Sequence, residues 1–125
     1  MDELVKLVYL SPMIVKELYQ MHETPNAVMH TLAAPSTGTS ELAVWTVEMR
    51  AGQAGPRHSA DREQVWVVLE GTLAINGEPV TGTTTIPANQ ERRIEARTDA
   101  RALVASRAPV TVTTADGTQP LPWAA

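Results

Sequence analysis

The chain has 125 residues, 43% of them hydrophobic, and a formal net charge of −4, so one globular domain is expected and a basic surface for nucleic acid or a membrane is not. It has no cysteine, which excludes disulfides, thiolate metal ligands and a cysteine nucleophile, and which fits a cytoplasmic protein. The N-terminus carries no long apolar run, so neither a signal peptide nor a transmembrane helix is expected, and a small molecule or a protein remains as the partner.

The N-terminal region, residues 1–26, predicts a strand followed by a helix. Residues 4–10 alternate well enough for a short strand. Ser11 suits a helix N-cap and Pro12 suits the first helical position. Apolar residues then recur at helical spacing, so one short helix is expected over residues 12–21.

From residue 27 to residue 115 the pattern is that of short strands separated by Gly, Pro and Asn. The expected strands are 27–33, 41–50, 64–69, 72–75, 78–80, 83–87, 92–97, 100–107 and 110–115. The Asn76-Gly77 pair predicts a tight hairpin turn. Residues 116–125 are expected to form an extended tail. Many short strands at near-regular spacing predict a sandwich or barrel, so residues 1–125 are interpreted as a single all-β domain with one short N-terminal helix.

Two stretches of this β region carry a recognisable spacing of residues. The order and spacing of Gly52, His58, Gln64 and Gly71 resemble the first motif of the cupin superfamily, in which glycines flank two histidines and a glutamate. The stretch "GTTTIPANQER", residues 82–92, resembles the second cupin motif.

In the second motif, Pro87 stands in place, Asn89 stands where a glycine usually falls, and Gly82 comes one residue late. Asparagine tolerates the left-handed backbone conformation that a glycine often supplies there. The resemblance covers roughly residues 41–107. It implies a double-stranded β-helix, a jelly-roll barrel with a pocket between its sheets. It also implies a homodimer in which an N-terminal strand is exchanged, and strand 4–10 is the candidate.

The resemblance also implies where metal ligands would lie, and most of them are missing. His58 occupies the first histidine position, but Ala60 stands at the second histidine, Gln64 at the glutamate and Arg92 at the third histidine. Alanine cannot ligate, an amide is a weak ligand, and a permanently protonated arginine repels a dication. We therefore expect no metal and no other cofactor.

The same carry-over places three polar side chains in the pocket. His58 is the candidate general acid or base, since histidine titrates near neutral pH. Arg92 is the candidate partner for a carboxylate, enolate or phosphate. Gln64 is a candidate hydrogen-bonding residue. Each side chain also has a purely structural interpretation: a loop histidine, an arginine paired with an interior acid, and an amide that satisfies a buried backbone group.

Apolar residues complete the predicted pocket. Alternation along strand 64–69 turns Trp66 and Val68 to the same face as Gln64, and alternation along strand 92–97 does the same for Ile94. Trp66 is a candidate stacking platform, although a tryptophan on an apolar strand face is more often core. Trp45 and Trp123 are interpreted as packing or interface residues.

Three functions remain open. The first is a metal-independent isomerase, cyclase or dehydratase that uses His58 as acid or base and Arg92 with Gln64 as oxyanion stabilisers. The arginine-over-lysine usage resembles that of high-GC bacteria, where small cupins accompany secondary metabolism. The second is a binding or accessory module without turnover. The third is a metal-dependent oxygenase or isomerase with unusual ligands, such as His58 with His30.

Overall fold

The computed structural model describes residues 4–10 and 13–125, with side chains described from Gln20 onward. The strands of this part of the chain are β1 Leu4–Leu10, β2 Met13–Thr24, β3 Ala27–Ala33, β4 Leu42–Met49, β5 Ser59–Ala60, β6 Gln64–Glu70, β7 Leu73–Ile75, β8 Glu78–Val80, β9 Thr83–Ile86, β10 Ile94–Ala96, β11 Ala100–Arg107, β12 Thr111–Thr114 and β13 Gly117–Pro120. Two short 3₁₀ helices, η1 Pro35–Thr37 and η2 Pro122–Ala124, accompany them. No helix in these residues has the length and apolarity needed to cross a membrane.

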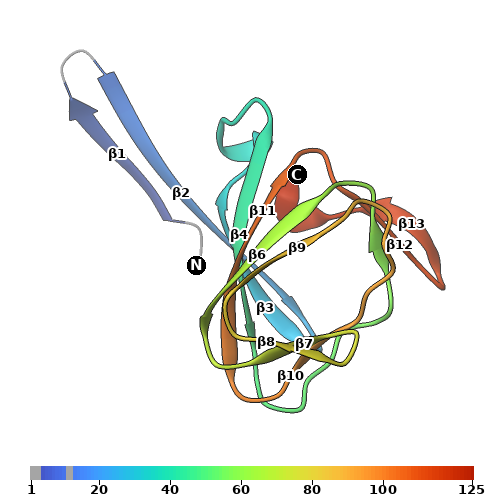
Figure 1. Ribbon diagram of the computed structural model, residues 1–125. Helices are drawn as coiled ribbons and strands as arrows, with labels where there is room; N and C mark the ends of the chain where they lie inside the picture. The colour runs from blue at the N-terminus through green and yellow to red at the C-terminus, as the bar shows by residue number, and fades with distance from the viewer. Residues whose placement is uncertain (1–3, 11–12) are drawn as a thin grey trace.

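The strands form three antiparallel sheets that enclose a barrel (Figure 1). The largest has seven strands in the order β1-β2-β3-β4-β11-β6-β9, and the other two have the orders β10-β7-β8 and β13-β12-β5. The hairpin of β1 and β2 extends away from the barrel (Figure 1). The predicted all-β class and the strand over 4–10 are therefore confirmed, while exchange of that strand between subunits stays a prediction.

The predicted helix over residues 12–21 is wrong, because β2 runs as a strand from Met13 to Thr24. Its first half pairs with β1 and its second half pairs with β3. The segment contains the β-branched Ile14 and Val15, which favour a strand when neighbouring strands offer hydrogen-bond partners. Helical spacing of apolar residues is a local signal. Hydrogen bonding of β2 to β1 and β3 overrides it.

The inner face of the large sheet forms much of the core. Along β11, Ala102, Val104 and Ser106 are buried, while Leu103 and Ala105 between them are half-exposed. This alternation is the two-residue period of a strand with one face against the core. The register places Val104 opposite both Trp45 on β4 and Trp66 on β6, so large aromatic residues flank a small one across the inner face.

Turns at the predicted motif positions have the backbone conformations that the sequence indicates. Asn76 and Gly77 both have positive φ, 52° and 84°, as a two-residue hairpin turn between β7 and β8 requires. Asn89 has φ of 66°, which confirms that it adopts the left-handed conformation. At Gly71, φ is 76° and a Cβ atom would overlap the backbone carbonyl of Asp99, so only glycine fits there.

The C-terminal tail is more ordered than an extended segment. Residues 117–120 form β13, which pairs with β12, and the backbone N–H of Leu121 donates to the carbonyl of Val110 at 3.0 Å. The hydroxyl of Thr31 on β3 donates to the carbonyl of Trp123 at 2.8 Å. The tail thus returns to the large sheet and helps to close one end of the barrel.

Candidate functional site

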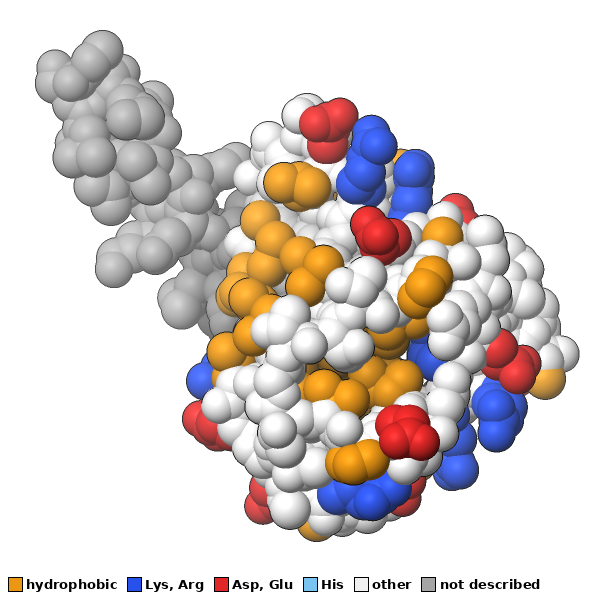
Figure 2. Space-filling view, viewed as in Figure 1, with side chains coloured by type: hydrophobic (Ala, Val, Ile, Leu, Met, Phe, Trp, Pro, Cys, Tyr) orange, Lys and Arg blue, Asp and Glu red, His pale blue; other side chains and the backbone are white. Residues whose placement is uncertain are grey.

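A cavity of about 440 Å³ lies inside the barrel, within the size range of pockets for small molecules. Its wall comes from the inner faces of β3, β4 and β6, from β10 and β12, and from the C-terminal segment 119–123. Figure 2 shows hydrophobic side chains gathered in a hollow on this side of the molecule. None of the described residues that line the cavity is Asp, Glu, Lys or Arg.

The structure brings most of the predicted site residues together. His58, Gln64, Trp66 and Ile94 all line this cavity. The other two predicted residues are buried but do not belong to its wall. Val68 is 9% exposed and lies on β6 two residues beyond Trp66, within the apolar core. Arg92 is 1% exposed and is not among the residues that line the cavity.

His58 and Arg92 are direct backbone neighbours. The N–H of His58 donates to the carbonyl of Arg92 at 2.9 Å, and the N–H of Arg92 donates to the carbonyl of His58 at 2.8 Å. Two residues that exchange both hydrogen bonds in an antiparallel pair carry their side chains on the same face. The two motifs therefore place an imidazole and a guanidinium side by side.

The imidazole of His58 is held in an orientation that leaves one nitrogen for chemistry. Its Nδ1 lies 2.9 Å from the carbonyl oxygen of Pro56, which can only accept, so Nδ1 carries the hydrogen and Nε2 keeps its lone pair. Burial lowers the pKa of His58 below its ordinary value of 6.5. The Pro56 carbonyl raises this pKa and the charge of Arg92 lowers it further. His58 is thus a neutral base at neutral pH.

The guanidinium of Arg92 is buried with no counter-charge among the described residues. The residue is 1% exposed, and its Nε, Nη1 and Nη2 atoms are buried with no hydrogen-bond partner among the described residues. Burial lowers the pKa of Arg92 from its ordinary value, but the group starts so high that it stays protonated. Burying a charge without a partner costs folding stability. The position of Arg92 therefore indicates a site at which a bound anion pairs with the guanidinium.

Gln64 and Trp66 form a second polar unit in the wall. The indole Nε1–H of Trp66 donates to Oε1 of Gln64 at 3.1 Å. Because an indole N–H can only donate, the oxygen of the amide faces Trp66 and the amide NH₂ remains for another acceptor. The bond also fixes the orientation of the indole ring beside the cavity.

Comparison with known proteins agrees with this geometry. No family model matches the sequence, and no curated protein does. Solved structures do match. The polyketide cyclase RemF from Streptomyces resistomycificus aligns with a TM-score of 0.61 and 18% identity over 85% of this chain and 78% of its own. An RmlC-like cupin from Shewanella frigidimarina aligns with a TM-score of 0.60 and 16% identity over 71% of this chain and 83% of its own. The chain has the cupin fold.

A third similar structure, the DMSP lyase DddQ from Ruegeria pomeroyi, aligns with a TM-score of 0.60 and 19% identity over 72% of this chain and 56% of its own. These proteins are described as a cyclase, a lyase and an RmlC-like cupin. At identities below 20%, these TM-scores establish the barrel fold and not the reaction. The chemistry follows from the residues of this chain.

The metal that cupin motifs imply does not fit the residues of this barrel. The described residues contain no group of three or more His, Cys, Asp or Glu side chains arranged to hold a metal ion. Ala60 offers no donor, the oxygen of Gln64 is engaged by Trp66, and Arg92 places a positive charge beside His58. A dication at this position would meet one imidazole and one guanidinium, which is an unfavourable donor set.

The pairing of His58 with His30 as metal ligands is also unsupported. His30 follows the buried Met29 on β3, so its side chain turns to the outer face of the large sheet. There its Nε2 lies 3.5 Å from a carboxylate oxygen of Glu48. His58 belongs to the interior of the barrel, so the two imidazoles lie on opposite sides of the sheet.

The sequence did not predict the remaining wall residues, and two of them, Trp45 and Trp123, are large aromatic residues. Trp45 and Trp123 line the cavity together with Trp66 and are not solely packing residues. These are all the tryptophans of the chain, which contains no phenylalanine. That composition was the available signal, because a chain without phenylalanine concentrates its large aromatic surface wherever its tryptophans gather.

Proposed function

We propose that this cupin-fold chain is an enzyme that moves a proton within a small organic molecule without a metal, in an isomerase, cyclase or dehydratase reaction. The observation that carries the proposal is the neutral imidazole of His58 in the cavity wall, backed by the unpaired guanidinium of Arg92. The likeness of the fold to RemF, which is described as a polyketide cyclase, supports a cyclase-type reaction.

In the proposed step, Nε2 of His58 takes a proton from a C–H or O–H group of the bound molecule, and the bonding electrons stay on the molecule as an enolate or phenolate. The positive charge of Arg92, the backbone neighbour of His58, stabilises this anion, and the amide NH₂ of Gln64 donates to it. The imidazolium then returns its proton to a different atom or to a leaving hydroxyl. Burial and Arg92 make the imidazolium a stronger acid, which favours that return.

The experiment that tests the proposal follows exchange of the acidic C–H protons of phenylpyruvate, an enolisable carboxylate, in D₂O by NMR with a chelator present. The wild-type protein should accelerate exchange, and His58→Ala should reduce the acceleration on the order of 10²-fold or more. His30→Asn is the matched control, because His30 lies on the outer face, and it should exchange like the wild type.

Equal exchange by the wild type and His58→Ala would contradict the proposal and would favour a binding module without turnover. Exchange that the wild type shows only when the chelator is left out would favour metal-dependent chemistry instead.

A further inference from the structure

The three tryptophans of the chain surround one cavity. Trp45 and Trp66 lie on either side of Val104 in a single row across the inner face of the sheet. Two strand spacings separate them, or about 10 Å. Trp123 reaches the same cavity from the C-terminal segment, where its carbonyl is anchored to Thr31, the residue paired with Trp45. Indole side chains therefore line the cavity from three separate elements.

Such a wall suits two different classes of ligand. Indole rings stack on planar conjugated molecules. They also attract cations such as quaternary ammonium groups through the negative faces of the rings. The tryptophans alone do not distinguish between these two classes of ligand. The charge of Arg92 does distinguish between them.

The charge of Arg92 is positive, and no described residue compensates it. The guanidinium of Arg92 lies beside His58, and its nitrogen atoms have no partner among the described residues. The described residues of the wall contribute no carboxylate that could neutralise it. In an apolar interior, charges interact more strongly than in bulk water, so the cavity favours an anion over a cation.

We propose that the cavity takes a planar, conjugated monoanion, such as an aromatic carboxylate, phenolate or enolate. This inference rests on the proposed function and deepens it, since it names the class of molecule whose proton His58 would move. Trp66 is the stacking residue whose orientation is fixed by Gln64, and Arg92 supplies the preference for negative charge.

Four probes of similar size test the inference by calorimetric titration of the full chain. They are 2-naphthoate, the neutral 2-naphthamide, the 2-naphthyltrimethylammonium cation and the saturated decalin-2-carboxylate. We expect 2-naphthoate to bind at least about tenfold more tightly than the saturated acid, which cannot stack. We expect a similar or larger preference for 2-naphthoate over the amide and the cation, because only the anion compensates the buried charge.

Two variants test which residue causes the preference for a planar ligand and which causes the preference for an anion. Trp66→Leu should remove most of the preference for 2-naphthoate over the saturated acid. Arg92→Met should remove the preference for 2-naphthoate over 2-naphthamide, whereas the outer-face control Arg101→Met should keep it. If Arg92→Met does not fold, the comparison of 2-naphthoate with 2-naphthamide on the wild type still decides.

Equal binding of all four probes, or tightest binding of the cation, would overturn the inference. The proposed function fails separately: 2-naphthoate would still bind selectively to a protein that exchanges no protons from phenylpyruvate.

Discussion

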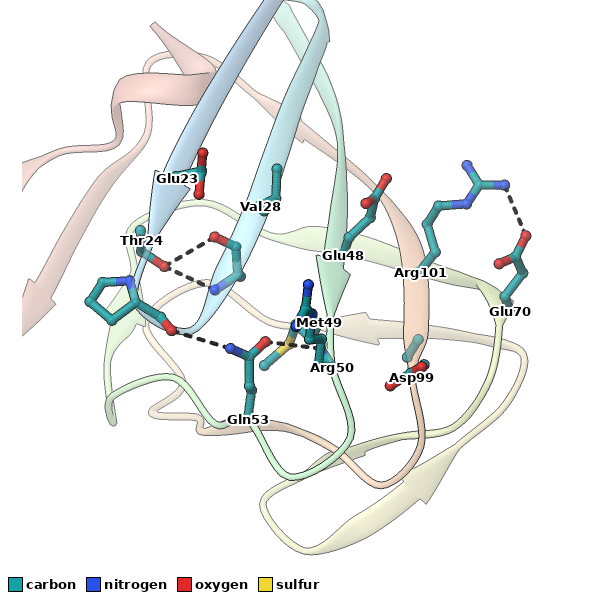
Figure 3. Close-up of a pocket in the computed structure, with 13 residues that line it drawn as sticks. Glu23, Thr24, Val28, Glu48, Met49, Arg50, Gln53, Glu70, Asp99 and Arg101 are labelled. Carbon is teal, nitrogen blue, oxygen red and sulfur yellow. Dashed lines mark hydrogen bonds and ion pairs between the residues drawn. The ribbon is translucent and has the colours of Figure 1, made fainter.

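The inner and outer faces of the seven-stranded sheet carry the same types of charged residue in different settings. On the outer face, Arg101 lies 3.5 Å from a carboxylate oxygen of Glu70, and His30 lies 3.5 Å from one of Glu48. Figure 3 shows the Arg101–Glu70 pair and Glu48 along an open concavity of this face. Inside the barrel, Arg92 lies beside His58 with no carboxylate as partner among the described residues.

The difference shows what burial does to a charged side chain. An exposed ion pair such as Arg101–Glu70 is solvated with or without its partner and contributes about 0 to 1 kcal/mol to stability. A buried guanidinium without a partner costs stability and creates a positive potential that water does not screen. The outer face therefore has the features of an ordinary solvated surface, and the inner face has those of a site that sacrifices stability for binding.

The largest expected effect on stability comes from replacing Arg92, and Arg101 is its control. Arg92→Met should raise the free energy of unfolding by about 1 to 4 kcal/mol, because an apolar side chain replaces an unpaired buried charge. Arg101→Met should change it by less than about 0.5 kcal/mol. Urea denaturation of both variants measures the difference. A clear loss of stability in Arg92→Met would show that the guanidinium has a structural partner and would remove the contrast between the faces.

The apolar residues of β11 provide a second comparison. Val104→Ala should lower the free energy of unfolding by about 2 kcal/mol, because Val104 is 0% exposed and its loss leaves a cavity between two tryptophans. Leu103→Ala removes more atoms, but from the half-exposed outer face, and should cost less than about 1 kcal/mol. Urea denaturation of both variants measures these losses of unfolding free energy. A larger loss in Leu103→Ala than in Val104→Ala would mean that the outer face at Leu103 is not exposed to solvent.

The pH dependence of stability sharpens the role given to His58. Its pKa in the folded protein lies below the ordinary 6.5, so the unfolded chain binds more protons near that pH. The contribution of His58 to stability is then complete above about pH 6.5 and is lost as the pH falls below it. Denaturation between about pH 5 and 8 should show a steeper acid loss for the wild type than for His58→Asn. Parallel curves would mean that burial does not perturb His58.

Much of the fold was predictable because it depends on local signals. Strand alternation and the Asn76-Gly77 turn were indicated by residue type, and the left-handed Asn89 was indicated by its place in the cupin-like motif; the structure confirms all three. The segment 13–21 was assigned wrongly because its strand depends on pairing with β1 and β3, which no local pattern reports.

The site was predictable only in part. Motif spacing identified His58 and Gln64 as cavity residues, and it placed Arg92 beside His58. It did not reveal that Arg92 is buried outside the cavity lining with no hydrogen-bond partner among the described residues, since that depends on which acids the remaining strands bring inside. Trp45 and Trp123 were missed as wall residues because register across β11 and the return of the C-terminal tail place them there.

Metal content is the most direct test of the claim that this barrel works without a metal. The protein should be purified without a polyhistidine tag from cells supplied with iron, manganese, nickel and zinc, and then analysed by mass spectrometry of its elements. One imidazole beside a buried guanidinium predicts only traces of transition metal, unchanged in His58→Ala. A stoichiometric metal that is lost in His58→Ala would contradict the claim.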